Sequence, residues 1–167
     1  MLRYSLLVRS MLFHSEALYN ITKAGLDLLE TVDVMLLRGI LKTPTSTPKE
    51  MLFLELGVVP LREIIRQRRF GFLFYILQEN PNSMVSRFFE AQRQNPTPKD
   101  WVKTILTDIR ELELDMKFEE IRKMKKNLFM NTAKRKIQYK TLKDLHKLKE
   151  KHLKTRFLKH AGLKMEK

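Results

Sequence analysis

Apolar residues recur along most of this chain at spacings of three and four, which is the pattern of an α-helix. The clearest run lies between Thr22 and Leu41, where Thr22 is suited to cap the start of a helix. Further leucine and methionine residues widen its apolar face, so we expect this helix to be central to the core. The residues that define the face are Leu26, Leu29, Val32, Leu36 and Ile40.

Strong signals for helix ends follow in the next part of the chain. Thr47 and Glu50 have the spacing of a capping box, in which each side chain accepts the backbone amide proton of the other residue. The proline between them suits the first helical position. Gly57 can end this short helix with a positive φ, and Pro60 can start a helix that we expect to reach about residue 78.

Two polar, proline-containing breaks divide the remainder, and each ends in residues suited to start a helix. Ser83 is expected to cap a helix that ends near residue 94. Thr97 and Asp100 repeat the capping-box spacing before a further helix, with Asp in the third position.

The two ends of the chain are also predicted to be helical. We expect a first helix over about Leu2–Leu18, which would leave His14 partly buried. A short helix over about 118–124 should precede a long one from about Asn127. No segment has the alternation of a strand, so the fold class is all-α: an irregular multi-helix bundle of about 6–8 helices with a long basic C-terminal helix. The narrow apolar stripe of that last helix is Met130, Ala133, Ile137, Leu142, Leu145 and Leu148.

The positive charge of the chain is confined to one end. The net charge is +14, yet residues 1–121 hold 16 basic and 16 acidic residues, whereas 122–167 hold 17 basic residues and 3 acidic ones. This division predicts a charge-balanced helical domain over 1–121 and a strongly basic helical extension over 122–167. Such a segment is typical of contact with nucleic acid or with an anionic membrane surface. The alternative is a basic face that meets only solvent.

Two groups of basic residues are candidates for contact with phosphate. Arg62, Arg66 and Arg69 are spaced four and three, so they share a helical face, and a guanidinium can bind two phosphate oxygens at once. If unpaired, this face would suit a nucleic-acid backbone. The alternative is a salt-bridged surface helix, with Glu55, Glu63 or Glu79 as partners. Arg68 lies nearer the apolar side and is a candidate to pair with a buried carboxylate.

The second basic group lies in the long C-terminal helix. Four of its lysines recur at four, three and four residues and form a continuous stripe, which can follow a phosphate backbone without reading bases. Tyr139 and Phe157 could stack on bases or face the core. The candidate residues are Lys134, Arg135, Lys136, Lys140, Lys143 and Lys147.

The sequence contains no recognisable set of catalytic residues. Without cysteine there is no disulfide, thiolate metal site or cysteine nucleophile. No phosphate-binding glycine loop or zinc-protease motif occurs. His146, His152 and His160 lie among lysines, which oppose cation binding, and Trp101 is interpreted as a hydrophobic anchor. We therefore predict no catalytic residue, cofactor or metal.

Three segments carry a resemblance to a known family. They are Leu36–Leu41 (LLRGIL), Thr47–Ile65 (TPKEMLFLELGVVPLREII) and the pair Arg68–Arg69. Together they resemble the region that follows the catalytic palm in reverse transcriptases of non-LTR (LINE-like) retrotransposons, over about Ser10 to Lys151. The resemblance implies a helical thumb and post-palm region that holds template and primer. The palm motif Tyr-x-Asp-Asp is absent, which implies a non-catalytic fragment that binds template–primer or element RNA.

One other interpretation remains open at this stage. The chain could be a helical protein-interaction fragment, with oligomerisation or packing against a missing palm domain through Leu2, Leu6, Leu7 and Phe13. No apolar run reaches the length of a membrane span. The Arg- and Ser-rich start is similar in composition to a mitochondrial transit peptide, but its helical spacing favours a core helix. The cellular location is not defined, although we expect a nuclear or cytoplasmic protein rather than a secreted one.

Overall fold

The computed structural model describes residues 3, 8–17, 21–98 and 100–160, with side chains as far as residue 153 of the last helix. All regular secondary structure in these residues is helical, which confirms the all-α prediction with its long C-terminal helix. No helix among them is long and apolar enough to cross a membrane. The helices are α1 (Arg9–Met11), α2 (Lys23–Leu41), α3 (Lys49–Glu55), α4 (Leu61–Gln78), α5 (Met84–Gln94), α6 (Trp101–Glu111), α7 (Phe118–Lys123) and α8 (Lys126–His160).

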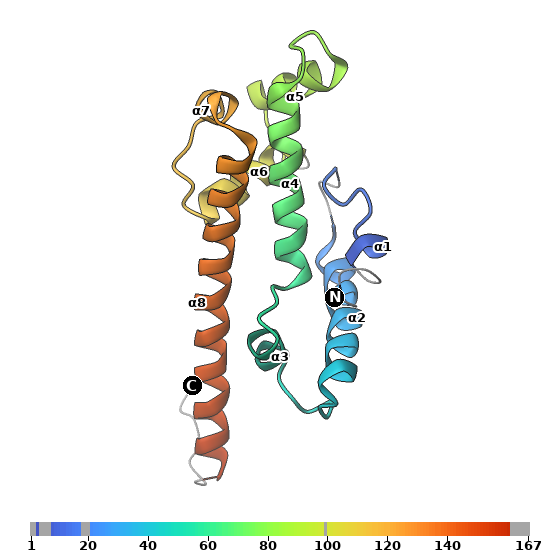
Figure 1. Cartoon of the computed structure of the whole chain (residues 1–167), viewed down its shortest axis with the longest axis vertical. Coiled ribbons are helices and arrows are strands. Elements are labelled where there is room, and N and C mark those ends of the chain that lie inside the picture. The colour runs from blue at the N-terminus through green and yellow to red at the C-terminus, as the bar shows by residue number, and fades with distance from the viewer. Residues whose placement is uncertain (1–2, 4–7, 18–20, 99, 161–167) are drawn as a thin grey trace.

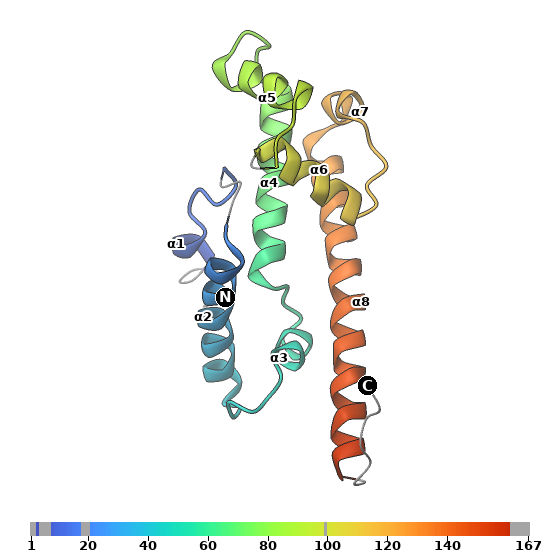
Figure 2. The same cartoon turned by 180° about the vertical axis from the view of Figure 1, so that it is seen from behind.

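Helix α4 is the centre of an elongated molecule. It lies between α2 on one side and α8 on the other, and α3 connects the lower parts of α2 and α8 (Figures 1 and 2). Helices α5, α6 and α7 gather at the opposite end of the molecule, where each contacts α4. Helix α8 therefore extends along nearly the whole length of the fold.

The main hydrophobic core surrounds the second half of α4. Phe70 and Phe74 lie against Phe129 at the start of α8, with ring centroids 6.1 and 5.9 Å apart. Val102 and Ile105 of α6 are fully buried in the same cluster. The change in charge between residues 121 and 122 therefore does not coincide with a break in the core, because the first half of α8 contributes to the same cluster as α4.

The buried side of α8 differs from the predicted stripe. Leu142 and Leu148, which we placed on the apolar face, are exposed. Each step of four residues turns about 40° beyond one full turn, so the buried strip rotates around α8 as it passes from α4 to α3. Buried residues recur at intervals of four: Phe129, Ala133, Ile137, Thr141 and Leu145.

Three of the predicted helix ends are confirmed. The Gly25 amide donates to the Thr22 hydroxyl over 3.1 Å, and the Ser86 amide donates to the Ser83 hydroxyl over 3.2 Å. Gly57 has a φ of 60° just after α3. These contacts involve residues close in sequence, which is why the sequence could predict them.

The predicted capping box of α3 is wrong. Pro48, not Thr47, is the N-cap, and no side chain caps this helix. Thr47 belongs to the preceding turn instead, because its amide donates to the Pro44 carbonyl over 3.1 Å. Its own carbonyl accepts a 2.9 Å hydrogen bond from Arg38. The Glu50 carboxylate lies 3.5 Å from His152 of α8.

The second proposed capping box is half formed. The Thr97 amide donates to the Asp100 carboxylate over 2.5 Å. Asp100 rather than Thr97 is the N-cap of α6, and no side chain caps this helix.

The predicted first helix ends earlier than expected, although residues 3 and 8 are also helical, with π-helical geometry. Only Arg9–Met11 is assigned as α-helix, and turns follow as far as residue 17. His14 has a φ of 53°, which is incompatible with a continuing helix, and its side chain is exposed rather than partly buried. Residues 2, 4–7 and 18, which the prediction included, lie outside the described residues.

Candidate nucleic-acid interface

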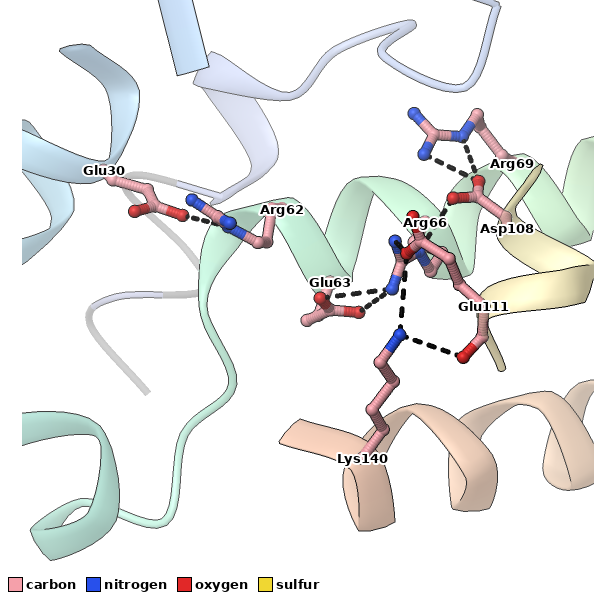
Figure 3. Close-up of polar contacts among 8 residues, drawn as sticks. All are labelled: Glu30, Arg62, Glu63, Arg66, Arg69, Asp108, Glu111 and Lys140. Atoms are coloured by element: carbon pink, nitrogen blue, oxygen red, sulfur yellow. Dashed lines mark hydrogen bonds and ion pairs between the residues drawn. The ribbon is translucent and has the colours of Figure 1, made fainter. Parts of the chain in front are cut away.

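The three candidate arginines of α4 all form ion pairs, as in the alternative of a salt-bridged helix (Figure 3). Arg62, at the start of the helix, donates from Nε to the carboxylate of Glu30 over 2.7 Å. Lys49 of α3 donates to the other oxygen of the same carboxylate over 3.1 Å. Glu30 therefore connects α2, α3 and α4.

Arg66 and Arg69 are satisfied one and two turns further along α4. Arg66 donates to Asp108 over 2.8 Å, to Glu111 over 2.6 Å and to Glu63 over 3.1 Å. Arg69 donates to the second oxygen of Asp108 over 2.8 Å. Both arginine side chains are only 13–14% exposed. Of the two alternatives left open by the sequence, the paired one holds: Glu63 is a partner that the sequence suggested, and Glu30, Asp108 and Glu111 are partners that it did not.

The pKa values of the two glutamates in this network shift in opposite directions, although burial raises both. Burial would raise the pKa of Glu30, but hydrogen bonds from Arg62 and Lys49 outweigh it, so its pKa is lowered. Burial also raises the pKa of Glu63, and the neighbouring Asp108 carboxylate raises it further. Arg66 counteracts only part of that effect, so the pKa of Glu63 stays above its ordinary value.

Arg68 lies on a different side of α4 from the other three. Its guanidinium donates to the backbone carbonyls of Val8 and Leu12, and a Glu16 oxygen lies 4.0 Å away. Its predicted pairing with a buried carboxylate is therefore corrected, because backbone carbonyls are its main partners and Glu16 is partly exposed. This arginine fixes the N-terminal segment on α4.

The basic residues of α8 form the cationic surface that remains accessible. Five of the six predicted residues are exposed, and no carboxylate pairs with them in the part of the chain that the structure describes. Lys140 is the exception, because its ammonium group donates to the Glu111 carbonyl over 2.9 Å and lies 3.6 Å from that carboxylate (Figure 3). We call the other five the α8 basic face: Lys134, Arg135, Lys136, Lys143 and Lys147. Lys136, Lys143 and Lys147 share one side of the helix, whereas Arg135 and Lys134 lie about 100° and about 160–200° around the axis from them.

Of the two aromatic residues considered for base stacking, Tyr139 has a described side chain. The Tyr139 side chain is 69% exposed, so it does not face the core. Phe157 lies beyond the described side chains. Tyr139 is thus the aromatic residue available next to the basic face.

An apolar cleft at the other end of the molecule was not anticipated from the sequence. It has a volume of about 300 Å³ and is lined by residues of α4, α5 and α6, with Met84, Val85 and Phe88 exposed at its edge. Trp101 forms part of its wall and is otherwise buried as the predicted anchor, with Nε1 donating to the Glu16 carbonyl over 2.9 Å. The periodicity of α5 alone could not show which of its apolar residues the other helices leave uncovered.

Within the described residues, no group of three or more His, Asp or Glu side chains is arranged to hold a metal ion. His146 is exposed, and His152 is half exposed beside Glu50. Comparisons with protein-family models, with curated proteins and with solved structures found no match. Any functional assignment therefore depends on the residues and the geometry described above.

Proposed function

We propose that this protein binds the phosphate backbone of nucleic acid through the α8 basic face and has no catalytic activity of its own. In this view it corresponds to the helical post-palm region of a non-LTR reverse transcriptase. The observation that carries the proposal is the group of five exposed cations on α8, which have no acidic partner in the described part of the chain. Arg66 and Arg69 take no part in binding, because they are largely buried and paired with carboxylates. Arg62 is left out of the proposed surface because it is held by Glu30, which it shares with Lys49.

The spacing of the cations on α8 suits a polyanion. Lys136 and Lys147 are separated by about 16 Å along the helix axis, because each residue adds about 1.5 Å. One strand of a duplex has about five phosphates over that length. Lysine ammonium groups on flexible stems can follow such a backbone without reading the base sequence.

The test is a salt titration of binding to a labelled RNA–DNA hybrid. Release of counterions from about three phosphates, which Lys136, Lys143 and Lys147 would neutralise, predicts that log affinity falls with log salt concentration at a slope of about −2.7. A variant with all five residues of the α8 basic face changed to Gln should lose most of the affinity and most of the slope. Substitution is preferable to removal of α8, because removal would also take Phe129 and Ile137 out of the core.

A matched control has the same loss of charge elsewhere on the surface. Five other exposed basic residues on or next to α2, α5 and α6 are changed to Gln in this variant, and it should keep nearly the wild-type affinity. An equal loss in both variants would show that net charge, not α8, governs binding. The control positions are Lys23, Lys42, Arg87, Lys103 and Arg110.

A second candidate function is interaction with another protein through the apolar cleft. Met84 and Phe88 are 88% and 65% exposed, which is unusual for large apolar side chains that lie side by side. Apolar docking would persist or strengthen as salt is added, whereas phosphate binding would weaken. Binding that resists salt and is lost in Phe88→Ser would favour this function over the first.

A further inference from the structure

A groove next to the α8 basic face combines cations with one exposed aromatic ring. It has a volume of about 180 Å³ and lies between α8 and the end of α6. Four lysines of α8 line it together with Tyr139, and Leu112 supplies an apolar wall. Tyr139 lies within one turn of both Lys136 and Lys143, so an aromatic face and two ammonium groups are presented side by side.

The charges in the groove do not suit a phosphate group alone. Glu111, Glu113 and Asp144 also line it. Glu111 is neutralised by Arg66 and Lys140, but Glu113 and Asp144 are exposed and have no cationic partner in the described part of the chain. Phosphates should therefore stay at the lysines along the rim, and the interior should favour an uncharged group with hydrogen-bond donors.

An unpaired nucleobase has these properties. It has a flat face that can stack on Tyr139, and base–aromatic stacking of this kind strengthens binding by about 5- to 150-fold per base. Its exocyclic amino group can donate to a carboxylate such as Glu113. In a duplex the base faces are already stacked on one another, so Tyr139 would have nothing to contact.

We propose that this groove is a binding site for one unpaired base, with Tyr139 as the stacking residue, so that the preferred ligand is single-stranded nucleic acid. The inference rests on the proposed function, because the rim lysines must hold the backbone. It adds a base-dependent contribution that phosphate contacts cannot supply.

The experiment compares a short single-stranded oligonucleotide with an abasic strand of the same length and charge, and with a blunt duplex. Wild-type protein should bind the base-containing strand at least about 5-fold more tightly than the abasic strand. Tyr139→Ala should abolish this ratio and leave the affinity for the abasic strand unchanged, whereas Tyr139→Phe should preserve it. Leu142→Ala, which changes an exposed residue less than one turn away, is the control and should also preserve the ratio.

Each other outcome has a distinct meaning. Equal wild-type affinity for the two strands, or an unchanged ratio in Tyr139→Ala, would overturn the base site but leave backbone binding intact. Failure to bind any of the three probes at low salt would overturn the proposed function itself. Binding of polyglutamate that is as tight as that of the oligonucleotide, and is equally weakened by Tyr139→Ala, would identify an acidic protein segment as the ligand instead. Tyr139 is exposed, so thermal unfolding should be the same in all variants.

Discussion

Asp108 decides the role of two of the three arginines on this side of α4, Arg66 and Arg69. It is 3% exposed, and its two oxygens accept hydrogen bonds from Arg66 and Arg69. Two guanidinium groups that would otherwise attract phosphate are thereby held between α4 and α6. The same arginines would be costly to bury if this carboxylate were neutral.

We expect Asp108→Asn to destabilise the fold by about 3 kcal/mol, because two largely buried arginines would lose their shared counter-charge. Urea-induced unfolding followed by circular dichroism measures the change. The control is Asp115→Asn, an exposed carboxylate on the surface, which should change stability by less than about 0.5 kcal/mol. Similar effects of the two substitutions would contradict the role assigned to Asp108.

Glu30 and Glu63 should respond to pH in opposite directions. The pKa of Glu30 is lowered from 4.5, so its stabilisation is present above pH 4.5 and is lost as the pH falls through its folded value. The pKa of Glu63 is raised from 4.5, so its contribution is greatest below pH 4.5 and is lost as the pH rises through its folded value.

Unfolding free energies measured against pH for wild type, Glu30→Gln and Glu63→Gln test this pair. The advantage of wild type over Glu30→Gln should grow as the pH rises towards 4.5 and above. The advantage of wild type over Glu63→Gln should shrink as the pH rises above 4.5. Parallel curves for the two variants would show that burial and pairing do not act on these glutamates as described.

At the scale of single elements, local chemistry decides where several helices begin or end. Thr22 and Ser83 cap α2 and α5 through their own hydroxyl groups, and Gly57 allows the chain to leave α3. Thr47 fails as a cap although its sequence context is favourable. Its backbone amide donates to the Pro44 carbonyl and its own carbonyl accepts from Arg38, so Thr47 belongs to the preceding turn and does not cap the helix.

Two glycines in these elements should respond oppositely to substitution by alanine. Gly39 lies inside α2 and a side chain there would meet no atom within 4 Å, so Gly39→Ala should stabilise the protein by about 0.5–1 kcal/mol. Gly57 has a φ of 60°, so Gly57→Ala should destabilise it by about 1–2 kcal/mol. The two variants can be compared in one set of urea titrations, and effects of the same sign would refute the argument.

At the scale of the whole molecule, α8 is both a core helix and a binding surface. Its first half packs on α4 and α3 through the buried strip from Phe129 to Leu145. Beyond Leu145, the described side chains are exposed or half-buried. In this part of the helix the His152 imidazole lies 3.5 Å from the Glu50 carboxylate of α3.

Amide hydrogen exchange should therefore divide α8 into two parts. Amides between Phe129 and Leu145 should exchange only through opening events close to global unfolding, because their side chains belong to the core. Amides from about residue 149 onward should exchange much faster, through local fraying. Uniform protection along the helix, measured by mass spectrometry or NMR, would mean that α8 opens as one unit.

The sequence by itself determined the all-helical fold, the ends of α2, α4 and α5, and the concentration of positive charge in residues 122–167. These features depend on side chains and neighbours within a few residues, so periodicity and capping chemistry were sufficient. Only the tertiary structure decided which cations stay free. The carboxylates that neutralise Arg62, Arg66 and Arg69 come from α2 and α6, more than thirty residues away for Glu30 and Asp108. The same packing exposes Tyr139 beside Leu112 and Glu113, an arrangement that no local pattern could reveal.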